Sequence, residues 1–78
     1  MPTTRIEGPY RFFFYSREPN EPRHTHIKRN SSEAKFWLDP INLAYNYGFS
    51  QKEIREIERI VNRNADLLRR KWDEFFGQ

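Results

Sequence analysis

The chain has 78 residues, a net charge of +3 and no cysteine. This length suits one domain with one small core, and the lack of cysteine excludes disulfides and thiolate metal sites. Hydrophobic residues make up only 36% of the chain, but aromatic residues make up 17%, which argues against disorder. We therefore expect a single folded domain, residues 1–78, whose core is built from few, large side chains.

The longest apolar run, Phe12–Tyr15, is far too short for a signal sequence or a membrane span. We therefore expect a cytoplasmic protein without a membrane partner. A net charge of +3 permits contact with nucleic acid but does not argue for it. Nothing in the sequence calls for a cofactor, so we expect none.

Residues 1–48 carry the signals of a β-rich part. Short aromatic and β-branched runs between turn residues predict four strands. These are Tyr10–Ser16, His24–Arg29, Glu33–Leu38 and Ile41–Tyr47. The last run could instead form a short helix, which would leave three strands. The connections are short, so an antiparallel meander is the simplest topology. Strict alternation in the last strand predicts one shared face for Ile41, Leu43, Tyr45 and Tyr47.

Residues 49–77 contain no proline and predict helix. Ser50 and Glu53 form a capping box, and apolar residues recur every three or four positions from Ile54 to Phe75. We expect one long helix over Ser50–Phe76, with a bend or break at Asn64 as the alternative. The fold class is then α+β: a small antiparallel meander of three to four strands, followed by one long C-terminal helix packed on one face.

The sequence His24-Thr25-His26 has the most chemical content in the chain. In a strand, residues i and i+2 project from the same face, so both imidazoles would lie side by side with Lys28 next in line. The pair could ligate a metal, with Glu18, Glu21 or Asp39 as third ligand. No third ligand is obvious, so we assign no metal site.

Two other functions would use the same histidines. They could act as general acid and base on a phosphodiester. They could instead recognise RNA or protein without chemistry. The plainest interpretation is that they only hold the preceding proline-rich loop by hydrogen bonds. In the acid–base case, nearby cations would hold phosphate: Arg17, Arg23, Lys28 and Arg29.

The aromatic run at residues 12–15 places apolar side chains on both faces of the sheet. One helix can cover only one face, and Trp37 lies on the opposite face from Phe36. We therefore predict that Phe13, Tyr15 and Trp37 form a protein-binding surface. The alternatives are that loops or the N-terminal segment cover these rings.

Over nearly its whole length the chain resembles an uncharacterised family of small prokaryotic proteins. This family is classed as a domain of unknown function and is marked by an N-x-P-x-His-x-His motif. The stretches that carry the resemblance are Phe14–Glu18, Asn20–His26, Ala34–Pro40, Gly48–Ser50, Glu53–Ile57 and Trp72–Phe76.

Members of that family are commonly encoded beside a second small protein, in pairs that look like type II toxin–antitoxin modules, with this family as the toxin. The resemblance implies that His24 and His26 are motif positions, with Arg17 as their companion. We therefore predict a toxin-like component that binds a small cognate protein from an adjacent gene, or itself. It would also bind or act on RNA through these three residues, and whether it is an enzyme stays open. The alternative is a non-enzymatic interaction module, as a homodimer, with structural histidines.

Overall fold

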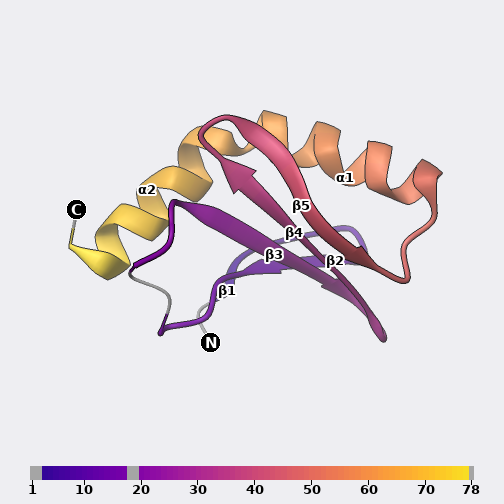
Figure 1. The fold of residues 1–78 in the computed structure, drawn as a ribbon, viewed down its shortest axis with the longest axis horizontal. Helices are drawn as coiled ribbons and strands as arrows, with labels where there is room; N and C mark the ends of the chain where they lie inside the picture. Colours follow the sequence, from indigo (N-terminus) through magenta and orange to yellow (C-terminus); the bar gives the residue numbers. More distant parts are fainter. Residues whose placement is uncertain (1–2, 18–19, 78) are drawn as a thin grey trace.

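The computed structural model describes residues 3–17 and 20–77, which form a five-stranded sheet followed by two helices (Figure 1). The strands are β1 (Thr3–Glu7), β2 (Tyr10–Phe13), β3 (His24–Arg29), β4 (Ser32–Leu38) and β5 (Ile41–Tyr47). The helices are α1 (Gln51–Arg63) and α2 (Ala65–Phe76). Among the described residues, no helix is long and apolar enough to span a bilayer.

The α+β class and the antiparallel meander are confirmed, because the sheet order follows the chain and all neighbouring strands pair antiparallel. The prediction of three to four strands is wrong, because β1 adds a fifth strand at the edge. Its sequence has no clear alternation, and it is fixed by tertiary contacts. Glu7 at its end binds Arg63 and Asn64 at the end of α1. Burial alone would raise the pKa of Glu7, but hydrogen bonds from Arg5 and Asn64 and the charge of Arg63 lower it.

The prediction of one long helix is wrong, and its alternative, a break at Asn64, is confirmed. The backbone there has φ −111° and ψ 14°, outside the helical range. The Asn64 side chain donates to the Ile60 carbonyl at 2.9 Å and to the Glu7 carboxylate at 3.2 Å. Asparagine competes for backbone partners in this way, which weakens a helix. The capping box of Ser50 and Glu53 is confirmed at the start of α1.

The core lies between one face of the sheet and the helices. Its sheet half comes from β2, β3 and β4, and its helical half comes mainly from α1. The members are Tyr10, Phe12, Ile27, Ala34, Phe36, Leu38, Phe49, Ile54, Ile57, Ile60, Val61 and Leu68. Eight of these side chains are aromatic or isoleucine, so a few rings and branched chains fill most of the small interior, as the composition predicts.

A β-bulge in β5 changes which side chains share a face. Lys35 pairs with Tyr45, but the next residue of β4, Phe36, pairs with Leu43, so Ala44 is the extra residue. The bulge reverses the alternation, so Ile41 packs on the core while Tyr45 projects from the other side of the sheet. The prediction that Ile41, Leu43, Tyr45 and Tyr47 share one face is therefore wrong.

Tyr10 links the sheet to α1 by a polar contact at the edge of the core. Its hydroxyl donates to the Glu56 carboxylate at 2.7 Å, and its side chain is 2% exposed. Burial, and then the hydrogen bond and charge of Glu56, raise the pKa of Tyr10 to about 12. An ionised phenolate would stand beside the Glu56 carboxylate, so ionisation of Tyr10 costs the fold stability.

This shift predicts an alkaline loss of stability. The folded pKa of Tyr10 lies above the unfolded value of about 10, so its contribution is complete below pH 10 and disappears as the pH rises through 12. Tyr10→Phe should remove this part of the pH dependence of the urea-unfolding free energy. Tyr47→Phe, at a position that is 69% exposed, should keep the wild-type slope. Equal slopes for Tyr10→Phe and wild type would contradict the assignment.

Candidate functional site

The side of the sheet away from the core, here called the second face, carries the predicted site. Along β3, Thr25 and Ile27 pair with Phe36 and Ala34 on the core side, so His24 and His26 project from the second face as the strand periodicity predicts. Contacting rings surround them and form what we call the ring cluster: Phe13, Tyr15, His24, His26, Trp37 and Tyr45. The histidines are therefore interior members of an aromatic layer.

His24 is held by the loop before it and by α2. Its Nδ1 lies 2.8 Å from the Pro22 carbonyl oxygen, which can only accept, so Nδ1 carries the proton. Its ring centroid lies 4.7 Å from that of Trp72 in α2 and 5.1 Å from that of His26. The imidazole is 1% exposed. His24 thus fastens the proline-containing loop to the sheet, which is the plainest of the sequence-based interpretations.

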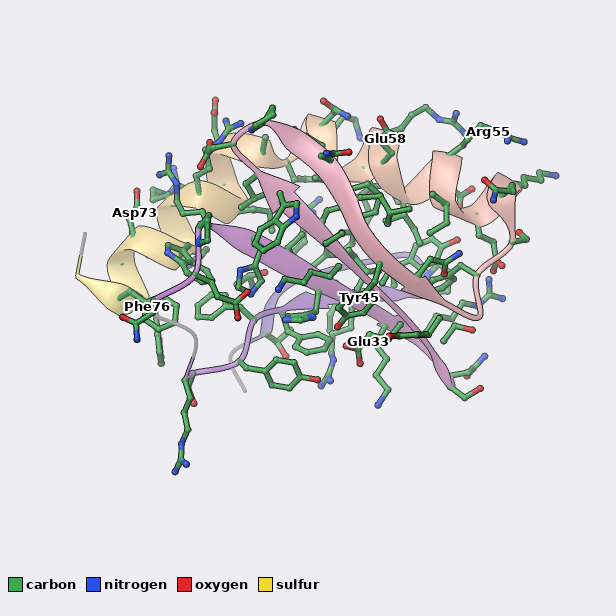
Figure 2. The ribbon with its side chains drawn as sticks, viewed as in Figure 1. Glu33, Tyr45, Arg55, Glu58, Asp73 and Phe76 are labelled. Carbon is green, nitrogen blue, oxygen red and sulfur yellow. The ribbon has the colours of Figure 1, made fainter. Side chains whose placement is uncertain are left out.

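His26 belongs to a chain of hydrogen bonds that runs across β3, β4 and β5. The Tyr45 hydroxyl donates to the Glu33 carboxylate at 2.8 Å, and Figure 2 shows these two side chains beside each other. Because that hydroxyl has one proton, its oxygen accepts from the His26 Nδ1–H at 3.1 Å. The His26 ring also stacks on Phe13 at 5.3 Å and meets Tyr15 edge-on at 4.6 Å.

This hydrogen-bond chain resembles those that orient a catalytic histidine, in which a second group fixes the tautomer. The His26 side chain is only 2% exposed, however. A general base must come within hydrogen-bond distance of its substrate. The arrangement therefore fixes the orientation of the imidazole, while the packed ring cluster denies a substrate access to it.

Arg17 and Arg23, two of the predicted phosphate-binding cations, lie in different surroundings. Arg17 is exposed after β2, and no hydrogen bond or ion pair joins it to another residue in the described part of the chain. Arg23 donates to Asp39 and to Asp73, each at 2.8 Å, and so ties the β4–β5 turn to α2. The hydrogen bond and charge of Asp39, followed by Asp73, raise the pKa of Arg23. Arg23 therefore acts as a structural clamp.

Lys28 and Arg29, the other two predicted cations, are both exposed at the end of β3. Arg29 reaches the Glu53 carboxylate of α1 at 3.2 Å. Lys28 forms no ion pair with any residue in the ranges that the structure describes. The structure does not bring these cations together with Arg17 and Arg23 around the histidines as one phosphate site.

The three predicted partner-binding rings differ in exposure. Phe13 is 0% exposed beneath the ring cluster, so it is not part of the surface. Tyr15 is 38% exposed. Trp37 is half-buried, and the Lys35 ammonium lies 4.3 Å from its ring centroid. Lys35 itself pairs with Glu21 of the covering loop at 2.6 Å.

A metal site at His24 and His26 would need a third protein ligand, for which the sequence offers Glu18, Glu21 and Asp39. Glu21 binds Lys35, and Asp39 binds Arg23 and Arg69, while Glu18 lies outside the described residues. Within residues 3–17 and 20–77, no three His, Asp or Glu side chains are grouped so as to hold a metal ion.

Glu33, Tyr45 and Trp72 contact the histidines, but the sequence alone did not single them out. The alternation of residues 41–47 places Tyr45 on the same face as Ile41. The bulge at Ala44 instead puts it on the face that carries the histidines. Trp72 is part of the helical stripe, and only the turn of α2 against the sheet reveals its contact with His24. The pairing of Lys35 with His26 in register could have suggested the position of Glu33 two residues earlier.

A family model described as a domain of unknown function (DUF4160) matches residues 10–73. The chain belongs to the DUF4160 family. The DUF4160 match begins at β2 and ends within α2, so it includes both histidines and the whole ring cluster. No curated protein and no solved structure matches the chain.

The hydrogen-bond chain predicts a specific effect of removing one hydroxyl. Tyr45→Phe deletes the group that serves both Glu33 and His26, so the urea-unfolding free energy should fall by about 1–3 kcal/mol. Tyr47→Phe removes a hydroxyl from an exposed ring two residues further along β5, and should change it by less than about 0.5 kcal/mol. If both variants are equally stable, the chain does not stabilise the second face.

Proposed function

We propose that this protein is a binding module: the toxin-like member of a two-gene, toxin–antitoxin-type pair, which associates with a small cognate protein. Its histidines then have a structural role. The observation that supports this proposal most directly is that the imidazoles of His24 and His26 are 1% and 2% exposed, with both Nδ1 atoms engaged. Burial of this degree favours association over catalysis, because acid–base chemistry needs direct access to substrate.

A second candidate function is acid–base chemistry on RNA at Arg17, His24 and His26. It is favoured by one observation, the hydrogen-bond chain from Glu33 through Tyr45 to His26. For this function the ring cluster would have to open before RNA could reach either imidazole. The two candidates therefore differ in whether the packed second face is the active state.

The edge strand β5 is the surface that we propose for the cognate protein. Among the described residues it pairs only with β4, so its outer backbone N–H and C=O groups have no described strand beside them. It contains no charged residue and no proline, the usual protections of an exposed edge. Leu43 is 39% exposed there, and Asn42 and Ala44 are exposed as well.

An edge of this kind suits a partner that supplies an extended, uncharged segment. Such a segment would add a sixth strand, with main-chain hydrogen bonds giving affinity and side chains beside Leu43 giving specificity. The bulge at Ala44 twists the edge locally, so the partner strand has to match that irregularity. This requirement would favour one cognate protein over general aggregation.

Charge at the edge should block this association. In co-expression with the product of the adjacent gene, Leu43→Lys and Ala44→Lys should reduce co-purification at least tenfold, because a buried unpaired ammonium is costly. Ser31→Lys, an equally small change in the exposed β3–β4 turn, is the matched control and should co-purify normally. Folded edge variants that bind as well as wild type would rule out β5 as the interface. Lack of co-purification of the wild-type pair would contradict the proposed function itself.

The role of the histidines is tested separately. The double variant His24→Asn/His26→Asn keeps an N–H donor near each Nδ1 and removes both imidazoles. If the histidines are structural, this variant should melt at a lower temperature but keep both growth inhibition and partner binding when folded. Loss of growth inhibition with fold and partner binding intact would instead support the catalytic candidate.

A further inference from the structure

One row of side chains crosses all five strands at the exposed end of the second face. Arg11 pairs with Ile6 and with Lys28, Lys28 pairs with Glu33, and Glu33 pairs with Tyr47. Directly opposed residues of antiparallel strands lie on the same face, so these five form what we call the cross-strand row. Its two ends are the most exposed large hydrophobic residues described, Ile6 and Tyr47, each 69% exposed.

Two cations lie side by side in the middle of this row. Arg11 and Lys28 are directly opposite each other on β2 and β3, and neither forms an ion pair with a residue of the described ranges. Like charges in this position destabilise a sheet. The Arg11 guanidinium lies 4.9 Å from the ring centroid of Phe13, which is fully buried, so this cation is held against the sheet surface. The pair forms a positive site that no ion pair within the described residues neutralises, although Glu33 lies opposite Lys28 on β4.

An aromatic platform adjoins the cations. The exposed ring of Tyr47 lies 4.9 Å from the ring of Tyr45, which is anchored by its hydroxyl to Glu33 at 2.8 Å. Lys28 and Tyr47 lie two strands apart, about 10 Å across the sheet. Glu33 lies between them. Cations near an exposed, supported ring suit the backbone and the bases of single-stranded nucleic acid.

We infer that the cross-strand row binds single-stranded nucleic acid, with Arg11 and Lys28 contacting phosphates and Tyr47 stacking on a base. The only carboxylate in the row, Glu33, is half-buried and accepts from Tyr45, which reduces its repulsion of a phosphate. A duplex would hide its bases from Tyr47, and an acidic peptide would have no base to stack on the ring. The combination therefore favours single strands over both.

This inference does not depend on the proposed function. It uses an exposed row on the second face, whereas the cognate protein would pair along the β5 edge at Leu43 and Ala44. It also differs from chemistry at the histidines, because none of the row's members is His24 or His26. Nucleic-acid binding and partner binding can therefore fail separately.

Fluorescence anisotropy of the full chain with labelled oligonucleotides of about ten nucleotides tests the inference. Single-stranded RNA and single-stranded DNA, each as oligo(U) or oligo(dT), show whether the ribose matters, and an RNA duplex of equal length is the comparison. The wild-type chain should bind single strands at least tenfold more tightly than the duplex. Its affinity should fall steeply between about 50 and 200 mM salt.

Substitutions in the cross-strand row distinguish the phosphate contacts from the stacking contact with a base. Arg11→Gln and Lys28→Gln should each weaken binding several-fold and reduce the salt slope by about one phosphate contact. Tyr47→Ala should weaken binding at least about fivefold, and Tyr47→Phe should restore it, since the stacking ring returns. Arg55→Gln removes one equal charge from the exposed side of α1 (Figure 2), which packs on the opposite face of the sheet from the row, and should leave binding unchanged.

Three results would overturn the inference. Equal losses for Arg55→Gln and Lys28→Gln would show that only net charge matters. Equal affinity for poly-glutamate, the duplex and the single strands would show an unspecific cation site. No binding by the folded wild-type chain at about 50 mM salt would show that the row has no affinity for nucleic acid. Lys28→Gln removes both a like-charge contact with Arg11 and an opposite-charge contact with Glu33, so its stability should stay close to wild type and its loss of binding cannot be attributed to unfolding.

Discussion

The two helices pack mainly on one face of the five-stranded sheet, so the second face has to bury most of its own apolar side chains. The ring cluster does this from within the sheet, with Tyr15 covering His26 edge-on and Trp72 reaching His24 from α2. A stacked imidazole has a flat surface like that of phenylalanine, but it also carries two nitrogen atoms that need partners. The hydrogen bonds to Pro22 and Tyr45 meet that need and make the cover specific.

Much of the fold can be predicted from the sequence alone. The bounds of β3 and β5, the capping box at Ser50 and the helical stripe all depend on local periodicity and turn chemistry, which a sequence displays directly. The missed features depend on contacts between distant residues. β1 is fixed by pairing with β2 and by the contact of Glu7 with Arg63, and the break at Asn64 involves the same carboxylate. One tertiary cluster thus accounts for both the fifth strand and the break between the two helices.

In the candidate site, too, the features that depend on local sequence could be predicted, and those that depend on tertiary contacts could not. The placement of His24 and His26 on one face follows from strand periodicity alone. Their surroundings do not, because a single extra residue at Ala44 decides whether Tyr45 faces the helices or the histidines. A sequence gives no direct sign of a bulge in a strand without glycine, so the Glu33–Tyr45–His26 chain could not be predicted.

Charge pairing separates the second face into two zones. Near the loop and the helix end, cations such as Arg23 and Lys35 are matched by carboxylates and connect parts of the fold. At the opposite end, Arg11 and Lys28 face each other, and neither forms an ion pair within the described residues. Glu33 lies opposite Lys28 on β4, but its carboxylate accepts from Tyr45. The like-charge contact is unfavourable for the sheet, and the proposed anionic ligand would offset it. The buried histidines and the exposed cations therefore have separate roles: the histidines stabilise the second face, and the cross-strand row is the part of that face open to a ligand.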